Sequence, residues 1–284
     1  MYIGAIEAGG TKTVCAVGKE NGEVIDSVTV PTSSPKETLA DIGSFFNRYE
    51  IRAMGVGMFG PINLEKDSGN YGRVLNTPKL AWRDFNVYDY LKKKYGVPVF
   101  LDTDVNAAAL GEFHWGAAKE AESCLYMTVG TGIGGGFVKE GKPYKGKYHA
   151  EMGHMYITKH PDDSFRGSCP YHAACLEGLA SGTAIKERYQ ESAQMLSENE
   201  KVWELESYYL AQAVVNQILI LSPEKVILGG GVLKQSQLYP LVRMKIVELL
   251  NGYVHTDDIE QWVVAPLLND QQGIKGAMAL VVLN

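Results

Sequence analysis

Short apolar segments bounded by turn residues recur along the first hundred residues, as they do in proteins built from β-strands. Residues 2–30 predict three strands, and Glu20-Asn21-Gly22-Glu23 supplies the hairpin turn between the second and the third. Two further apolar segments, residues 51–58 and 97–101, predict two more strands. This part of the chain therefore predicts a β-sheet.

Apolar residues at helical spacing follow these strands. Residues 39–49 predict a helix that packs on the sheet. Ser34 as N-cap, Pro35 at the first helical position and Glu37 three residues after the cap complete a capping box. Residues 105–112 are rich in alanine and other helix formers and predict a second helix.

The second half of the chain repeats this plan. Its predicted elements are strands at 123–129 and 136–140, a loop-rich stretch at 141–175, a long helix at Trp203–Leu221, a short buried strand at 225–228, and helices after Gln237 and from Gly273. The repetition predicts an α/β protein with two domains. We place the N-terminal domain at residues 1–116, with the last helix packing back on it, and the C-terminal domain at residues 117–272.

A glycine-rich turn between two apolar strands occurs in each half. The first is Glu7-Ala8-Gly9-Gly10-Thr11-Lys12, and the second is Gly130-Thr131-Gly132-Ile133-Gly134-Gly135-Gly136. Such turns expose backbone N–H groups that suit phosphate oxygens, although most glycines between strands only make tight hairpins. Both turns carry a Thr, and Lys12 adds a mobile positive charge. The pair predicts two related halves that bind one phosphorylated ligand.

The composition and charge of the chain argue against several classes of protein. The chain has 284 residues, 45% of them hydrophobic, which is enough for two domains with cores. A formal net charge of −6 with interspersed signs offers no basic surface for nucleic acid. No run approaches the roughly 18 apolar residues of a membrane span, and no signal-peptide pattern begins the chain. We expect a cytoplasmic protein that binds neither nucleic acid nor membranes.

Two histidines and two cysteines have the spacing of a structural zinc site. His154, Cys169, His172 and Cys175 offer two imidazoles and two thiolates, three of them within seven consecutive residues. The alternative is a set of unrelated loop residues. Closely spaced soft ligands in a reduced protein favour zinc, which would fold a loop that lacks a core of its own.

Asp104 lies where a predicted strand ends and a predicted helix begins. Ligands bind at this edge of open α/β sheets, so its carboxylate is a candidate general base for a hydroxyl nucleophile. Asp is also a preferred N-cap residue, and that alternative fits the same position. Asp102 is the weaker candidate for the base.

Six motifs in this order resemble the ROK family of sugar kinases, within the actin-like ATPase (ribonuclease H-like) fold, over the whole chain. They are Glu7 to Lys12, Asp104 to Glu112, Gly130 to Gly136, Glu151-Met152-Gly153-His154, Cys169 to Glu177 with Ser181-Gly182, and Gly229-Gly230-Gly231-Val232. The Cys-Pro-Tyr-His segment at 169–172 and His160-Pro161-Asp162-Asp163 are most similar to the bacterial fructokinase branch. The resemblance implies an α/β fold of two duplicated β-sheet and helix halves with a cleft between them.

The resemblance also implies roles for residues at matching positions. Asp104 matches the catalytic base. The implied sugar contacts are Asn76, Asn106, Asp104, Glu151, His154 and Glu177, of which Asn76 and Asn106 fit a turn or cap equally well. The implied ATP and phosphate contacts are Gly9, Gly10, Thr11, Lys12, Gly130, Thr131, Gly132, Gly134, Gly182, Thr183, Gly229, Gly230, Gly231 and Val232.

The chain departs from the family pattern at three positions. His172 stands where many relatives have a third cysteine, so the implied zinc ligands are His154, Cys169, His172 and Cys175. Thr183 replaces a frequent Pro. Glu7 replaces an Asp that lies near magnesium and the phosphates in many relatives.

The implied activity is ATP-dependent phosphorylation of D-fructose to fructose 6-phosphate, with Mg²⁺ on the nucleotide and a structural Zn²⁺. Glucose, mannose and N-acetylmannosamine remain alternative acceptors. A non-catalytic sugar sensor is an alternative of another class, because the family includes repressors. Those repressors carry a DNA-binding segment before the first turn, whereas here the first predicted strand begins at Tyr2. Family members are commonly dimers or tetramers, and we expect a homodimer.

Overall fold

The computed structural model describes residues 1–256 and 258–284 and divides the chain into two compact units. Unit 1 comprises Met1–Glu120, Phe137–Ala150 and Leu267–Asn284, and unit 2 comprises Ala121–Gly136 and Glu151–Pro266. The hydrophobic pattern of the sequence suggested one boundary near Gly116 and a returning last helix. It contained no signal for the segment 137–150.

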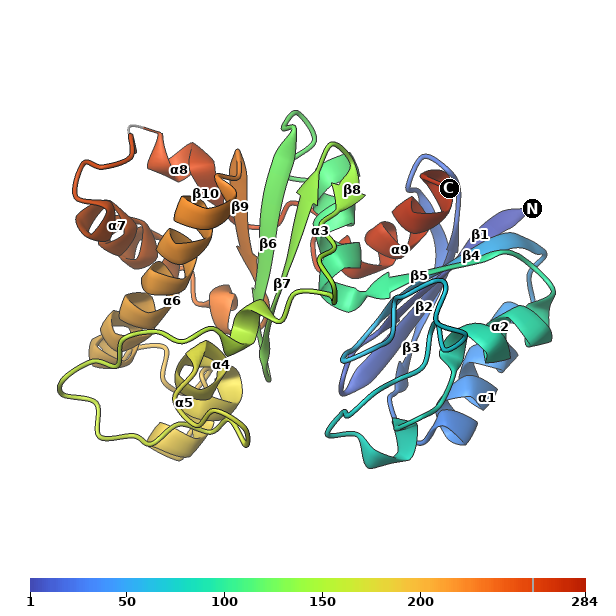
Figure 1. Cartoon of the computed structure of the whole chain (residues 1–284), viewed down its shortest axis with the longest axis horizontal. Coiled ribbons are helices and arrows are strands. Elements are labelled where there is room, and N and C mark those ends of the chain that lie inside the picture. The colour runs from blue at the N-terminus through green and yellow to red at the C-terminus, as the bar shows by residue number, and fades with distance from the viewer. Residues whose placement is uncertain (257) are drawn as a thin grey trace. The chain divides into compact units, whose positions relative to one another are not determined.

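Unit 1 is built on a five-stranded sheet (Figure 1). Its strands are β1 (Tyr2–Ala8), β2 (Lys12–Gly18), β3 (Val24–Pro31), β4 (Ile51–Met58) and β5 (Val99–Thr103). They lie in the order β3-β2-β1-β4-β5, with β1, β2 and β3 antiparallel and β4 and β5 parallel to β1. The carboxyl ends of β1, β4 and β5 therefore share one edge of the sheet.

Helices cover both faces of this sheet. They are α1 (Pro35–Phe46), α2 (Val87–Tyr95), α3 (Asp104–Trp115) and α9 (Gln272–Val282), with a short 3₁₀ helix, η1 (Leu80–Trp82). On one face, α1 contacts β2 and β3, and α2 contacts β5. On the other face, α3 and α9 contact each other and β4.

Glycines allow α9 to pack at backbone distance. A Cβ at Gly55 would lie 1.7 Å from the carbonyl oxygen of Ala277, and one at Gly276 would lie 1.5 Å from that of Ala107. A larger residue at either position would push α9 away from β4 or α3. These contacts fix the helix that the sequence predicted from Gly273.

The second sheet has the same plan. Its strands are β6 (Ser123–Val129), β7 (Ile133–Lys139), β8 (Lys142–Pro143), β9 (Lys225–Gly229) and β10 (Val263–Val264), in the order β10-β9-β6-β7-β8. This order matches that of the first sheet strand for strand, and β9 is again parallel to its neighbours β6 and β10. The duplication predicted from sequence is thus present in the fold.

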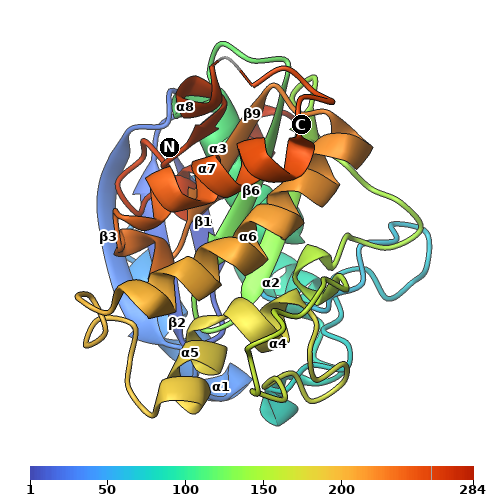
Figure 2. The ribbon, with the colours of Figure 1, turned by 90° about the vertical axis from the view of Figure 1, so that its left-hand side faces the viewer.

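The helices of unit 2 are more varied in length. They are α4 (Leu176–Ala180), α5 (Gly182–Tyr189), α6 (Glu200–Leu221), α7 (Leu238–Leu250) and α8 (Ile259–Trp262), with 3₁₀ helices η2 (Met152–His154) and η3 (Val232–Lys234). The long helices α6 and α7 lie side by side over one face of the sheet (Figure 2). Trp203 and Tyr209 on α6 are buried, so they belong to the core of this unit.

Several local predictions are confirmed. The Ser34 hydroxyl accepts from the Glu37 N–H and the Glu37 side chain accepts from the Ser34 N–H, which is the predicted capping box. The strand predicted at 136–140 begins earlier, at Ile133, because Gly134, Gly135 and Gly136 continue the strand instead of the turn. The glycine-rich turn itself is therefore short, at residues 130–132.

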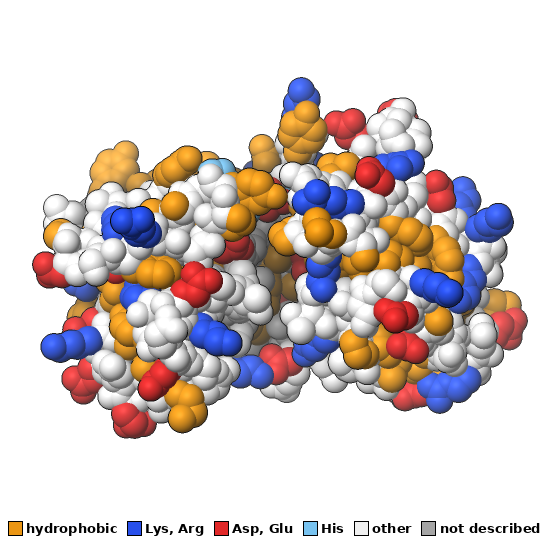
Figure 3. Space-filling model, turned by 90° about the horizontal axis from the view of Figure 1, so that it is seen from below, with side chains coloured by type: hydrophobic (Ala, Val, Ile, Leu, Met, Phe, Trp, Pro, Cys, Tyr) orange, Lys and Arg blue, Asp and Glu red, His pale blue; other side chains and the backbone are white. Residues whose placement is uncertain are grey.

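On the face drawn in Figure 3, Lys and Arg side chains lie among Asp and Glu side chains in each unit. Among residues 1–256 and 258–284, no helix combines the length and the apolar character that crossing a bilayer requires.

Candidate active site

The first glycine turn connects β1 to β2 in unit 1. It is closed by one backbone hydrogen bond, from the Gly9 N–H to the Lys12 carbonyl oxygen at 3.0 Å. The residue after β3 supports the turn: the Thr32 hydroxyl donates to the Gly9 carbonyl oxygen at 2.8 Å, and the Thr32 N–H donates to the Thr11 carbonyl oxygen at 3.0 Å. Gly10, Thr11 and Lys12 are exposed, so their N–H groups and the ammonium are accessible to a ligand.

Asp104 lies at the carboxyl end of β5 and is the first residue of α3. The N-cap of this helix is Thr103, whose hydroxyl accepts from the Asn106 N–H at 3.1 Å. Asp104 Oδ1 accepts from the neighbouring Val105 N–H at 2.9 Å. Because Thr103 performs the capping, the alternative assignment of Asp104 as the N-cap is wrong.

Asp102 is buried next to this position and is held on three sides. Its Oδ1 accepts from the Thr103 N–H at 2.8 Å and from the Asn106 amide at 2.7 Å, and its Oδ2 lies 2.9 Å from Lys145 Nζ. The Asn106 side chain is buried and directed at Asp102. Asp102 therefore anchors the start of α3, and with it the backbone that carries Asp104.

Glu7 lies at the end of β1, close to two other acidic side chains. Burial and the nearby Asp104 raise the pKa of Glu7 to about 7, Lys12 opposes this shift, and Asp270 adds to it. A Cβ at position 273 would lie 2.2 Å from the Glu7 carboxyl carbon, so Gly273 at the start of α9 leaves room for it. The carboxyl group thus takes up a proton readily until a cation comes close.

Hydrogen bonds from the start of α5 hold the second glycine turn in place. The Gly130 N–H donates to the Gly132 carbonyl oxygen at 2.9 Å, and the Gly182 N–H donates to the Gly130 carbonyl oxygen at 2.7 Å. The Thr183 hydroxyl donates to the Thr131 carbonyl oxygen at 2.7 Å. The N-terminus of α5 therefore binds the back of the turn, where Thr183 adds a contact that Pro would lack.

Glu177 on α4 also binds this turn. Its Oε2 accepts from the Ile133 N–H at 2.9 Å. Its Oε1 lies 3.9 Å from His154 Nε2, which is too long for a hydrogen bond. Glu177 and His154, two of the implied sugar contacts, are therefore neighbours in unit 2, and Glu151 begins the 3₁₀ turn that ends at His154.

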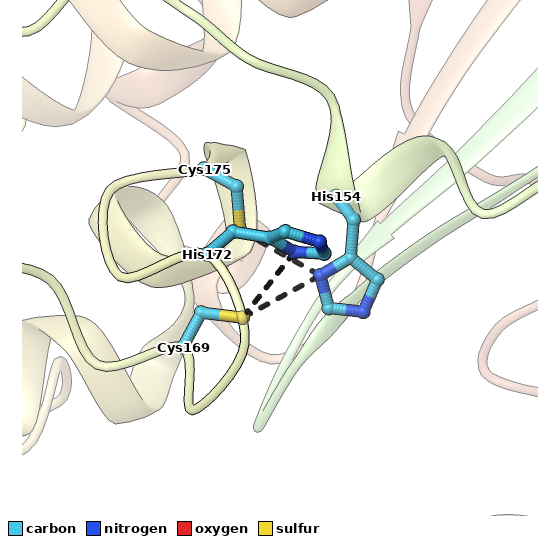
Figure 4. Close-up of side chains that lie close together, drawn as sticks. All are labelled: His154, Cys169, His172 and Cys175. Atoms are coloured by element: carbon cyan, nitrogen blue, oxygen red, sulfur yellow. Dashed lines mark hydrogen bonds between the residues drawn. The ribbon is translucent and has the colours of Figure 1, made fainter. Parts of the chain in front are cut away.

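His154, Cys169, His172 and Cys175 converge as the spacing predicted (Figure 4). His154 Nδ1 lies 3.7 Å from Cys169 Sγ and 3.6 Å from Cys175 Sγ, and Cys169 Sγ lies 3.8 Å from His172 Nδ1. A tetrahedral zinc ion, with Zn–S bonds of about 2.3 Å and Zn–N bonds of about 2.0 Å, separates S and N ligands by about 3.5 Å. The donor set and its spacing fit zinc.

A buried ion pair supports the loop before this cluster. Asp163 Oδ2 lies 3.1 Å from Arg188 Nη2 and accepts from the Tyr209 hydroxyl at 2.6 Å. Burial opposes ionisation of Asp163, but Tyr209, the Phe165 N–H and Arg188 hold its pKa below the ordinary value. The His160-Pro161-Asp162-Asp163 motif therefore fastens its loop to α5 and α6.

The third glycine cluster follows β9. Gly230 has a φ of 93°. A Cβ at this position would also lie 2.4 Å from the Val129 carbonyl oxygen, so only glycine fits. Gly231 is exposed, and Val232 is buried at the start of η3. The last implied site residue, Asn76, is exposed between η1 and β4.

Sequence patterns did not identify Lys145 or Arg188, which hold Asp102 and Asp163. Each basic residue is distant in the chain from the aspartate that it pairs with. An isolated basic residue in a loop or helix gives no signal of an ion pair. His149 was also missed: its Nε2 accepts from the Ile62 N–H at 3.3 Å, and burial lowers its pKa, which Asp102 and Asp104 oppose.

Comparison with known proteins gives one consistent result. The ROK family model matches residues 3–283. A Bacillus subtilis (strain 168) protein is 48% identical over 98% of this chain and 94% of its own length. The fructokinase of Pediococcus pentosaceus is 41% identical over 99% of this chain and 97% of its own. Proteins named glucokinase are 29 to 31% identical.

Solved structures agree with the fold. The crystal structure of the ROK hexokinase from Thermus thermophilus superposes with a TM-score of 0.79 at 28% identity, covering 99% of this chain and 97% of that one. The α/β class and the actin-like ATPase fold predicted from sequence are confirmed. With the family model spanning nearly every residue, the chain belongs to the ROK family.

Proposed function

We propose that the protein is an ATP:D-fructose 6-phosphotransferase. The observation that carries this proposal is the difference in sequence identity between two groups of relatives. Four proteins named fructokinase are 38 to 41% identical over at least 93% of this chain, and those named glucokinase are less similar over less of it. The residues of the chain support the chemistry.

Asp104 is the proposed general base. The C6 hydroxyl of the sugar attacks the γ-phosphorus of ATP, and the Asp104 carboxylate accepts the hydroxyl proton as the new O–P bond forms. The bond between the γ-phosphorus and the bridging oxygen then breaks, and ADP leaves. Because Thr103 caps the helix, the Asp104 carboxylate is not needed for that role.

The two glycine turns are the proposed phosphate contacts. The exposed N–H groups of Gly10 and Thr11 and the Lys12 ammonium suit the transferred phosphoryl group, whose charge is spread over three oxygens. The turn at Gly130 to Gly132 presents backbone groups whose positions are set by α5. The glycines after β9 would let adenosine lie against the backbone.

Mg²⁺ bound with ATP would neutralise charge on the β- and γ-phosphates and orient them. Glu7 is the proposed carboxylate of unit 1 for that ion, because burial and the nearby Asp104 raise its pKa to about 7 even with Lys12 close by. A cation there would favour the ionised carboxylate.

Glu151, His154 and Glu177 are the proposed sugar contacts in unit 2. Zinc on the Cys/His cluster would fold the loop that carries them. Its four ligands are His154, Cys169, His172 and Cys175. With Nδ1 turned to the metal, His154 keeps Nε2 and its proton for a sugar hydroxyl. A rigid loop suits a sugar, which is recognised by several hydrogen bonds at once.

The test is an ADP-release assay with ATP and Mg²⁺ on fructose, glucose, mannose and N-acetylmannosamine, with zinc content measured on the same sample. We expect the highest kcat/KM on fructose and about one zinc per chain. Highest turnover on another hexose would overturn the substrate assignment but keep the kinase. A folded, zinc-loaded protein without turnover on any sugar would contradict the enzyme and favour the sugar sensor.

Assembly and location remain part of the proposal. We expect a homodimer in the cytoplasm, where ATP and hexose are both present. Light scattering coupled to size-exclusion chromatography tests the first of these, since a monomer of 31.1 kDa and a dimer differ twofold in mass.

A further inference from the structure

Glu177 occupies a position that a sugar contact alone does not explain. One carboxylate oxygen binds the second glycine turn, and the other faces a residue of the Cys/His cluster. We propose that Glu177 is a positioning residue that couples the loop around the Cys/His cluster to the second glycine turn, so that a change in the turn alters sugar binding. This proposal rests on the proposed sugar and phosphate roles of the two segments.

The hydrogen bond to the turn is the first support. Glu177 Oε2 accepts from the Ile133 N–H at 2.9 Å, and the two residues are 44 positions apart in the sequence. Ile133 is buried, and it is the first residue of β7, directly after the turn. A charge-assisted hydrogen bond at a partly buried amide is among the stronger interactions of its kind, so it ties the end of the turn to α4.

The fit around Gly132 is the second support. A Cβ at this position would lie 2.5 Å from Glu177 Oε2 and 3.3 Å from its carboxyl carbon. No other heavy atom is that close to the Cβ position. Alanine at 132 would therefore displace the Glu177 carboxylate in particular.

The contact on the other side completes the coupling. Glu177 Oε1 lies 3.9 Å from His154 Nε2, while His154 Nδ1 faces the two cysteines. A histidine bound to a metal through Nδ1 carries its proton on Nε2, which a nearby carboxylate then orients. The Glu177 carboxylate thus lies between the turn and a ligand of the cluster, in contact with one and facing the other.

Two glycines of the same turn provide a matched pair of variants. Gly132→Ala places a Cβ against the Glu177 carboxylate, whereas Gly130→Ala places one where no atom lies within 4 Å. Neither glycine has a positive φ, so alanine fits the backbone at both positions. The two variants differ in whether they disturb Glu177.

The experiment measures fructose binding by calorimetry without nucleotide, so that the proposed phosphate role of the turn plays no part. We expect Gly132→Ala to weaken fructose binding about tenfold, as displacement of one charged hydrogen-bonding group does, and Gly130→Ala to change it less than about twofold. Equal binding by wild type and Gly132→Ala would overturn the coupling.

A double-mutant cycle with Glu177→Gln separates coupling from general damage. If Gly132→Ala acts through Glu177, it should weaken fructose binding by less than about twofold further in the Glu177→Gln background. Effects that multiply would contradict the proposal. Zinc content and the unfolding temperature of each variant check that the loop and the fold persist.

Hydrogen exchange gives a result that does not depend on fructose. In Glu177→Ala the amide of Ile133 loses its acceptor, so exchange in the peptide over 130–136 should speed up at least about tenfold, while that over β9 stays unchanged. Unchanged exchange at 130–136 would overturn the proposal. If wild type binds no hexose but this exchange speeds up, the proposed function fails and the Glu177 contact stands.

Discussion

The two glycine turns occupy equivalent places in the duplicated sheets, yet they are held and surrounded differently. The first is closed by a hydrogen bond from Gly9 to Lys12 and is held by Thr32, which binds the carbonyl oxygens of Gly9 and Thr11. Its charged neighbours are Glu7 and Asp104, and Lys12 adds a positive charge. The second is bound from behind by Gly182 and by Glu177. The first turn is rich in charge and is held by the residue that follows β3, whereas the second is fixed by contacts from two helices.

We infer from this difference that the two turns would contribute to the proposed reaction in different ways. A turn beside charged groups is suited to stabilise the charge that develops during the proposed phosphoryl transfer. A turn fixed by neighbouring helices keeps its N–H groups in place before the ligand binds, which costs no ordering at that moment. We therefore expect charge changes to matter most at the first turn and steric changes to matter most at the second.

The largest effect is expected at Asp104, beside the first turn. Asp104→Asn keeps the size of the side chain but cannot accept the hydroxyl proton, so kcat should fall about 10²- to 10⁴-fold. Fructose affinity should stay within about threefold. Both are measured by the ADP-release assay and calorimetry.

Thr103→Ala is the matched control for Asp104→Asn. It removes the N-cap of α3, so it should cost about 1 kcal/mol of unfolding free energy while kcat changes little. Wild-type turnover in Asp104→Asn, or a loss in Thr103→Ala as large as that in Asp104→Asn, would break the assignment of the base.

Lys12→Met tests the charge of the first turn and should have the next largest effect. Methionine keeps most of the length of the side chain but loses the ammonium, so kcat/KM for ATP should fall about 10- to 100-fold, the value of one or two charge-assisted hydrogen bonds. Lys19→Met is the control, because Lys19 is exposed and pairs with Glu23 on the hairpin. Equal effects of the two substitutions would show that the charge of Lys12 has no special role, and the first turn would then not be distinguished by its charge.

Local patterns in the sequence predicted most of the fold. The capping box at Ser34 and Glu37 and the strands at both glycine turns depend on neighbours in the chain, so spacing alone locates them. The sequence placed the glycines at 134–136 in the turn, whereas they belong to β7. A buried strand that packs closely also favours glycine, so glycine alone does not distinguish the two. The division of unit 1 into three segments depends on tertiary contacts, which leave no periodic signal.

The candidate site was predictable where one short segment carries the chemistry. The Cys/His cluster was located because three of its four residues lie between Cys169 and Cys175. The contacts of Glu177 with Ile133 and of Lys145 with Asp102 were not, since each joins loops or helices that meet only in the folded chain. Sequence thus located the Cys/His cluster but not the long-range contacts that position side chains around the candidate site.

A pair of glycine substitutions tests whether the second turn is more tightly packed than the first. The expected effect is smaller than those above. A Cβ at Gly182 would lie 2.8 Å from the Gly130 carbonyl oxygen, whereas one at Gly10 has no heavy atom closer than 3.9 Å. Gly182→Ala should therefore cost about 1 to 3 kcal/mol of unfolding free energy, and Gly10→Ala less than about 0.5 kcal/mol. Denaturant unfolding measures both. The same cost at both positions would show that the two turns are equally constrained.

The last prediction concerns Glu7, whose pKa is raised by burial and by the nearby Asp104. With a pKa of about 7 in the folded protein and 4.5 as the ordinary value, Glu7 binds more protons in the folded state than in the unfolded state between these values. Unfolding free energy should therefore fall as pH rises through this window. Glu7→Gln lacks the titration and should lose less stability between pH 5 and pH 7.5, by on the order of 2 kcal/mol.

Denaturant unfolding of wild type and Glu7→Gln at the two pH values, without Mg²⁺ or nucleotide, tests this prediction. Parallel pH dependence in the two proteins would show that Glu7 ionises as an ordinary carboxyl group, and the first turn would then lose its distinguishing electrostatic feature. If the difference appears and Mg²⁺ with ATP abolishes it, the cation has replaced the proton on Glu7. That result would place the charge-dependent step of the reaction at the first turn and leave the second with the fixed backbone.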